Sequence, residues 1–228
     1  MPRRIIWTLT LFFIIFFTPD MYAGKILEEP MQRYCMSIPN TATADSKLPV
    51  LICLPGSGIK ARQDINVWAF ISDKRGFLVI DLDIDYSQEG PGGVYSRIQN
   101  VINSLPANTG INKDKVFIAG TSAGGMMALA LALFYPHKFK ATGIISGSRL
   151  SFEAENFLKN ARSQLFYLYH GKKDKRVSIR EFYATKKKLE ANGAIIESKV
   201  IEEGEHTLPS GCYKEVVDWF YQLSELSQ

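Results

Sequence analysis

Residues 116–134, VFIAGTSAGGMMALALALF, are the feature that most limits how this chain can fold. An apolar run typical of a buried strand passes into an apolar helix through Gly-Thr-Ser-Ala-Gly-Gly, where a polar loop with a capping residue would be usual. Glycines this close together indicate a backbone turned too sharply for residues that carry a Cβ atom. The sequence therefore predicts a tight strand-to-helix turn with Ser122 at its centre.

After residue 23, short apolar runs alternate with helical runs. The expected strands are 31–38, 49–54, 77–83, 115–119, 141–146, 164–170 and 195–201. The expected helices are 62–72, 93–105, 123–135, 153–162, 178–191 and 211–225. Apolar strands that alternate with helices are typical of a mostly parallel sheet covered on both faces. We therefore expect one α/β domain over residues 24–228, without repeats or an internal linker.

The first 23 residues differ from the rest. Arg3 and Arg4 precede an apolar run over 5–17, and Pro19 follows it. This order is typical of an export signal, for which Ala23 is the expected cleavage point. The run would span about 20 Å as a helix, short of the ~30 Å hydrocarbon core of a bilayer. We expect an exported protein, periplasmic or secreted. The alternative is an uncleaved N-terminal anchor, the only case in which we expect membrane contact.

Net charge and cysteine spacing bear on possible partners, disulfides and metal sites. The net charge is +4 and the longest basic block is 186–188, so we expect no nucleic-acid partner. Export permits disulfides among Cys35, Cys53 and Cys212. Cys53 lies inside an apolar run and is expected to be a buried free thiol, whereas a Cys35–Cys212 pair stays open. No spacing resembles a metal site, and we expect neither a metal nor a cofactor.

Residues 120–124 have the form Gly-x-Ser-x-Gly. Between a strand and a helix this pattern is a nucleophile elbow, which lifts the serine above the carboxyl edge of the sheet. The helix begins directly after it, so free N–H groups and the positive helix end face the same place. The alternative is a tight turn with only a structural role, and the flanking strand and helix favour the elbow.

A serine hydroxyl is a weak nucleophile and needs a base, and the chain has three histidines. We expect His137 at the surface and His170 to support a neighbouring loop. His206 follows the last expected strand, and Asp174 follows the strand before it. The order Ser122, Asp174, His206 is the Ser…Asp…His order of one group of hydrolases, and it predicts a catalytic triad. The alternatives are an exposed loop histidine and an ordinary charged turn.

Attack by a serine on an ester creates a negative oxygen that two backbone N–H groups can stabilise. Ala123 follows the serine and is expected to supply one of them. Ser57, in the loop of LICLPGSGIK after an early strand, is expected to supply the other, although a generic glycine turn is the alternative. The loop after the strand 77–83 should overlook the same edge, and we predict substrate contacts for Tyr86 and Tyr95.

With these residues the chain resembles the α/β-hydrolase superfamily, and within it the small secreted esterases related to polyhydroxybutyrate depolymerases and feruloyl esterases. The resemblance is carried by the stretches 48–58, 111–148, 169–178 and 204–209. It implies an α/β-hydrolase fold and hydrolysis of small or polymeric carboxylic esters through an acyl-enzyme. The alternatives are an exported prolyl-oligopeptidase-like peptidase or an acyltransferase with the same triad, and a binding protein without activity.

Two positions depart from the pattern of those esterases. The oxyanion loop usually reads His-Gly, whereas this chain has Pro55-Gly56. Thr207 follows His206, where many feruloyl esterases have a cysteine, so a feruloyl specificity is not supported. The chain between the strands 141–146 and 164–170 has room for one helix only. We therefore expect an open site without a sizeable lid.

Overall fold

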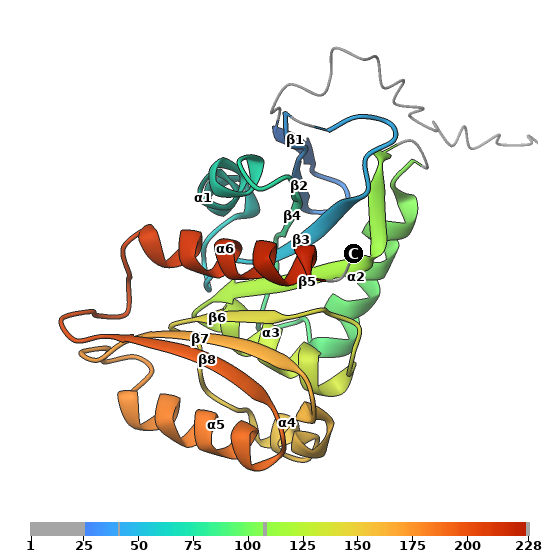
Figure 1. Ribbon diagram of the computed structural model, residues 1–228. Helices are drawn as coiled ribbons and strands as arrows, with labels where there is room; N and C mark the ends of the chain where they lie inside the picture. Colours follow the sequence, from blue (N-terminus) through green and yellow to red (C-terminus); the bar gives the residue numbers. More distant parts are fainter. Residues whose placement is uncertain (1–25, 41, 107–108, 227–228) are drawn as a thin grey trace, which may run out of the picture.

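The computed structural model describes residues 26–40, 42–106 and 109–226, and the predicted signal segment lies outside them. These residues form one sheet in the order β1-β2-β4-β3-β5-β6-β7-β8 (Figure 1). The strands are β1 (Ile26–Glu29), β2 (Tyr34–Ser37), β3 (Leu48–Leu54), β4 (Leu78–Leu82), β5 (Ile111–Thr121), β6 (Thr142–Ile145), β7 (Leu165–Gly171) and β8 (Ile195–Ile201). Strands β3 to β8 pair in parallel, and β1 and β2 add an antiparallel edge. The predicted mostly parallel α/β fold is confirmed.

Helices cover both faces of the sheet (Figure 1). They are α1 (Ala61–Asp73), α2 (Pro91–Ser104), α3 (Ala123–Phe134), α4 (Phe152–Glu155), η3 (Leu158–Ala161), α5 (Ile179–Ala191) and α6 (Gly211–Glu225). α1 and α6 share one apolar core with the sheet, and α2, α3 and α5 pack on the opposite face. No helix within the described ranges has the length and apolar character needed to cross a membrane. The apolar runs of the central strands β3 to β7 are therefore buried on both sides, as their composition requires, whereas the edge strands β1 and β8 are partly exposed.

Three predicted elements differ from the structure. The strand expected over 31–38 is the second half of a hairpin, β1 and β2, whose turn includes Arg33 at a φ of 59°. β5 begins at Ile111, before its apolar stretch, because Leu48 of β3 pairs with that residue. The single helix expected over 153–162 is two short pieces, α4 and η3. Asn160 donates a 2.9 Å hydrogen bond to the carbonyl of Leu133, which ties η3 to the end of α3.

The chain between β6 and β7 holds only α4 and η3, so no sizeable lid is inserted there. The three cysteines are buried and free: Cys35 in β2, Cys53 in β3 and Cys212 in α6. The burial predicted for Cys53 is confirmed, and the pairing left open between Cys35 and Cys212 is absent.

Asp81 of β4 is an acidic side chain buried inside the fold. Its exposed fraction is 0%, and its neighbours across the sheet are Cys53 on one side and Cys35 on the other. Burial, followed by the negative charge of Asp64 on α1, raises the pKa of Asp81 well above its ordinary value. Neither oxygen of Asp81 has a hydrogen-bond partner among the described residues. The ionised side chains of Asp64 and Asp81 can only accept hydrogen bonds. A proton bound to Asp81 provides the donor that this pair otherwise lacks.

We expect Asp81→Asn to stabilise the protein at about pH 8 by about 1 kcal/mol or more, because the amide keeps a donor without having to bind a proton at a pH where the unfolded carboxyl group has lost it. The native Asp81 binds its proton more tightly than the unfolded chain does. Wild-type stability therefore falls as pH rises above the unfolded pKa, and the advantage of the variant should shrink as pH is lowered. Urea unfolding at about pH 5 and pH 8 measures this, with exposed Asp45→Asn as control. An advantage that is equal at both pH values contradicts the assignment.

Candidate active site

Ser122 lies in the turn between β5 and α3, with a φ of 51° and a ψ of −117°. Its N–H donates to the carbonyl of Ile145 at 2.8 Å, which ties the turn to β6. A Cβ atom on Gly120 would lie 2.3 Å from the backbone of Gly124, and one on Gly124 would lie 1.9 Å from the carbonyl oxygen of Leu54. No side chain fits either position. The predicted strand–elbow–helix geometry is present, and its glycines allow the close approach of three backbone segments.

Two hydrogen bonds join the three side chains of the predicted triad. Ser122 Oγ lies 2.8 Å from His206 Nε2, and His206 Nδ1 lies 2.8 Å from Asp174 Oδ2. The Asp174 side chain is fully buried, and that of His206 is 14% exposed. An ionised carboxylate only accepts, so Nδ1 carries the proton and Nε2 is free to accept from the serine hydroxyl. The structure thus brings together three residues that are far apart in the sequence.

The other oxygen of Asp174 fixes the orientation of its carboxylate. Asp174 Oδ1 accepts the backbone N–H groups of Arg176 at 2.8 Å and Val177 at 3.0 Å. Oδ2 is therefore left to face His206. These two amides were not predicted, since their role depends on the tight turn after Asp174 and not on side-chain identity.

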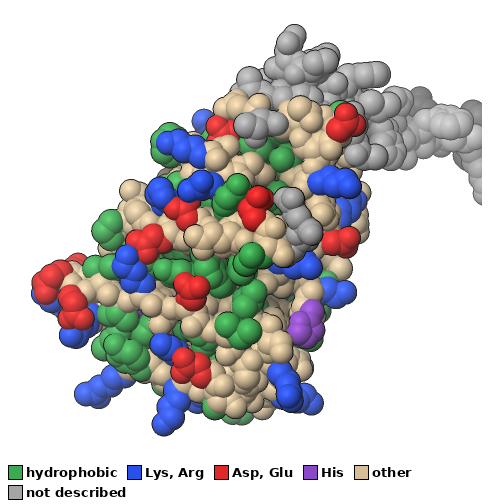
Figure 2. Space-filling view, in the orientation of Figure 1, with side chains coloured by type: hydrophobic (Ala, Val, Ile, Leu, Met, Phe, Trp, Pro, Cys, Tyr) green, Lys and Arg blue, Asp and Glu red, His purple; other side chains and the backbone are tan. Residues whose placement is uncertain are grey.

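The loop of His206 rests directly on the loop of Asp174. The N–H of Lys173 donates to the carbonyl of Gly204 at 2.8 Å, and a Cβ atom on Gly171 would lie 2.2 Å from the carbonyl oxygen of Glu205. At the surface, Lys172 pairs with Glu202 at 2.6 Å, and Figure 2 shows acidic and basic side chains close together at this left-hand tip. A glycine at the end of β7 and another after β8 are the sequence signal that could have indicated this contact.

The loop after β3 lies beside Ser122, as predicted. A Cβ atom built on Gly56 would lie 3.6 Å from that of Ser122, and Ile59 donates to the Gly56 carbonyl at 3.0 Å to close the turn. The Ser57 amide in this turn has no hydrogen bond within the described segments. Ala123 is the first residue of α3, where helix geometry leaves the N–H unpaired. Both predicted amides are therefore unpaired, and their role as donors to the negative oxygen stays a prediction.

The two tyrosines that were predicted to contact substrate lie in different places. The Tyr86 hydroxyl donates to the carbonyl of Pro55, so this side chain braces the loop that carries Ser57. Burial raises the pKa of Tyr86, which keeps the hydroxyl protonated as a donor.

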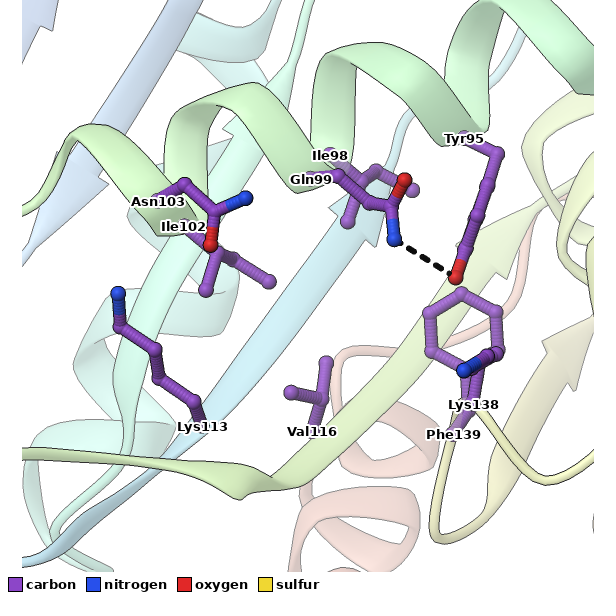
Figure 3. Close-up of a pocket in the computed structure, with 9 residues that line it drawn as sticks. All are labelled: Tyr95, Ile98, Gln99, Ile102, Asn103, Lys113, Val116, Lys138 and Phe139. Atoms are coloured by element: carbon purple, nitrogen blue, oxygen red, sulfur yellow. Dashed lines mark hydrogen bonds between the residues drawn. The ribbon is translucent and has the colours of Figure 1, made fainter.

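Tyr95 of α2 stacks on Tyr135 with ring centroids 3.8 Å apart. Tyr135 caps the far end of α3, about 20 Å from Ser122 along the helix. In Figure 3, Tyr95 lines a separate pocket with an apolar floor that includes Ile98 and Phe139. The prediction of a substrate contact for Tyr95 beside Ser122 is therefore wrong: its spacing in α2 turns it toward α3 and not toward the carboxyl edge.

The other two histidines have the positions expected for them. His137 is exposed after α3. His170 is buried at the end of β7, 3.6 Å from Asp174 through its Nε2. No group of three or more His, Cys, Asp or Glu side chains that could hold a metal ion is present in the described part of the chain.

The chain is similar in sequence to known proteins. Residues 79–223, more than half of the chain, match the phospholipase/carboxylesterase family. Acetylxylan esterase A of Aspergillus awamori is 30% identical over 92 residues, which are 35% of this chain and 30% of that protein. The chain thus spans less than a third of the length of this curated relative.

Solved structures share the fold at low sequence identity. Esterase B from Lactobacillus rhamnosis superposes with a TM-score of 0.67 at 16% identity, covering 90% of this chain and 86% of that one. Porphyromonas gingivalis dipeptidyl peptidase 4 superposes with a TM-score of 0.64 at 12% identity, covering 83% of this chain and 33% of that one. The fold is therefore shared by esterases and peptidases. The chain belongs to the phospholipase/carboxylesterase family and has the α/β-hydrolase fold.

Proposed function

We propose that this protein hydrolyses carboxylic esters, with Ser122 as nucleophile, His206 as general base and Asp174 as the acid that orients the histidine. The observation that carries this proposal is the unbroken chain from Asp174 Oδ2 through His206 to Ser122 Oγ, with two contacts of 2.8 Å. A serine hydroxyl in contact with a correctly oriented imidazole is the arrangement that acyl transfer needs.

In the proposed reaction, Ser122 Oγ attacks the ester carbonyl carbon while His206 Nε2 takes the hydroxyl proton. The amides of Ala123 and Ser57 donate to the oxygen that becomes negative. The tetrahedral intermediate collapses, the bond to the alcohol breaks, and the alcohol leaves with the proton from Nε2. Water then attacks the acyl-enzyme with His206 again as base, which releases the carboxylic acid and free Ser122.

Acetyl and other short acyl esters of bulky or polymeric alcohols are the proposed substrate class. The open edge supports this, because only α4 and η3 lie between β6 and β7 and leave room for a large alcohol. The match to acetylxylan esterases also supports it, although it covers only 35% of this chain. Export to the periplasm or the medium, where polymeric esters are found, remains part of the proposal.

Hydrolysis of p-nitrophenyl acetate, butyrate and octanoate, compared with p-nitroacetanilide, tests this function. We expect kcat/KM to fall with acyl length and the anilide to react at least about 100-fold more slowly than the acetate ester, because the amide leaving group is far poorer. An organophosphate label should react with one residue, Ser122, and peptide mass mapping identifies that residue. Faster turnover of the anilide than of every ester would favour the peptidase alternative.

A further inference from the structure

His170 is a second histidine at the acid of the proposed triad. It lies on β7, its side chain is 0% exposed, and its ring packs 5.3 Å from that of Phe182 on α5. His170 Nε2 lies 2.9 Å from the carbonyl oxygen of Val177. A carbonyl only accepts, so Nε2 carries the proton and donates. The same nitrogen lies 3.6 Å from Asp174 Oδ2, the oxygen that binds His206.

The other ring nitrogen, His170 Nδ1, is buried and has no hydrogen-bond partner among the described residues. A buried acceptor without a donor destabilises a fold, and an apolar side chain of similar size would avoid this penalty. The packing against Phe182 alone therefore gives no reason for a histidine here. The group that an apolar side chain would lack is the N–H that faces Val177 and Asp174.

Val177 connects His170 to the carboxylate. Its N–H donates to Asp174 Oδ1 at 3.0 Å, and its carbonyl accepts from His170 Nε2 at 2.9 Å. Both backbone groups of Val177 are thus hydrogen-bonded, and they fix the turn that holds Asp174. Burial lowers the pKa of His170, which keeps the ring neutral. A neutral donor can hold the turn without cancelling the negative charge that Asp174 presents to His206.

We propose that His170 is a positioning residue: its Nε2–H fixes the turn from Asp174 to Val177, and so holds the carboxylate in line with His206. This inference rests on the proposed function of the triad. It gives His170 a role in catalysis that acts through Asp174, without contact between His170 and the substrate.

Three variants at this position separate the donor from the bulk of the side chain. His170→Leu removes the donor, and His170→Phe also removes it while keeping a ring against Phe182. His170→Gln keeps an N–H near the place of Nε2. We expect His170→Leu and His170→Phe to lower kcat by about 10- to 100-fold with KM almost unchanged, since a small misplacement of a catalytic group has effects of this size. His170→Gln should recover most of the lost kcat. The exposed change His137→Leu is the control and should leave kcat and KM unchanged.

The pH profile provides a readout that loss of packing alone would not move. If Asp174 is no longer held beside His206, the imidazolium of His206 is less stable, and the acidic limb of kcat/KM shifts to lower pH in the Leu and Phe variants. Equal activity and an unshifted limb in these variants would overturn the proposal. So would an equal loss in the Gln variant when circular dichroism shows all three to be folded.

A proton NMR measurement keeps this test independent of the proposed function. The Nδ1 proton of His206, hydrogen-bonded to Asp174, should give a resonance far downfield in the wild type and in His170→Gln, and lose it in His170→Leu. A resonance that persists in His170→Leu overturns the positioning role even where no ester is hydrolysed. Absence of Ser122-dependent hydrolysis in a wild type that shows this resonance would instead overturn the proposed function.

Discussion

Ser122→Ala is expected to lower kcat for p-nitrophenyl acetate by at least about 10⁴-fold, because no other group takes the place of an activated oxygen in acyl transfer. The fold should be kept, since the substitution removes one oxygen and leaves the backbone unchanged. Burst kinetics with substrate in excess over enzyme give the decisive measurement: the wild type should release p-nitrophenol in an initial burst equal to the enzyme concentration, and the variant should show none.

Ser146→Ala is the matched control for this substitution. Ser146 has the same φ of 51° as Ser122, lies at the end of the adjacent strand β6, and is buried. Its Oγ has no hydrogen-bond partner in the part of the chain that the structure describes, and it has no place in the proposed chemistry. Removal of this hydroxyl should leave kcat within about 3-fold of the wild type. A burst that persists in Ser122→Ala would assign the reaction to another nucleophile.

The elements that could be predicted from the sequence are those whose signal is local. β8 and α6 begin and end at the predicted residues, because Ile and Val at both ends of β8 and an apolar stripe along α6 lie between turn residues. The positions of Ser122, Asp174 and His206 followed from one further fact, that parallel strands bring their carboxyl ends to a single edge. Local pattern and topology together were therefore sufficient for the three side chains.

The features that were missed depend on contacts between distant segments. β1 has partly exposed residues and exists because it pairs with β2, so its own composition carries little strand signal. Tyr95 was placed in the correct helix but on the wrong side of it, because its partner Tyr135 is set by how α2 packs on α3. The amides of Arg176 and Val177 act through the backbone, which the identity of a side chain does not reveal.

Asp174→Asn is expected to lower kcat by about 10³- to 10⁴-fold while leaving the protein folded. The reason lies in the two amides that bind Asp174 Oδ1. An asparagine has one accepting oxygen, and the N–H groups of Arg176 and Val177 should both bind it. Its NH₂ group then faces His206 Nδ1 and donates to it. The histidine is forced into the tautomer with a proton on Nε2, which cannot accept the proton of Ser122.

Asp174→Ala separates this tautomer effect from simple loss of the side chain. It should reduce kcat by a similar factor, but it leaves the buried amide of Val177 and the part-buried amide of Arg176 without an acceptor, so the free energy of unfolding should fall by about 1–3 kcal/mol. Asp174→Asn should unfold at nearly the wild-type denaturant concentration. Glu205→Gln, an exposed change in the loop of His206, is the control and should alter neither quantity. If Asp174→Asn kept kcat within about 10-fold of the wild type, the orienting role of the carboxylate would be wrong, and the amide of an asparagine would serve this site as well as a charge.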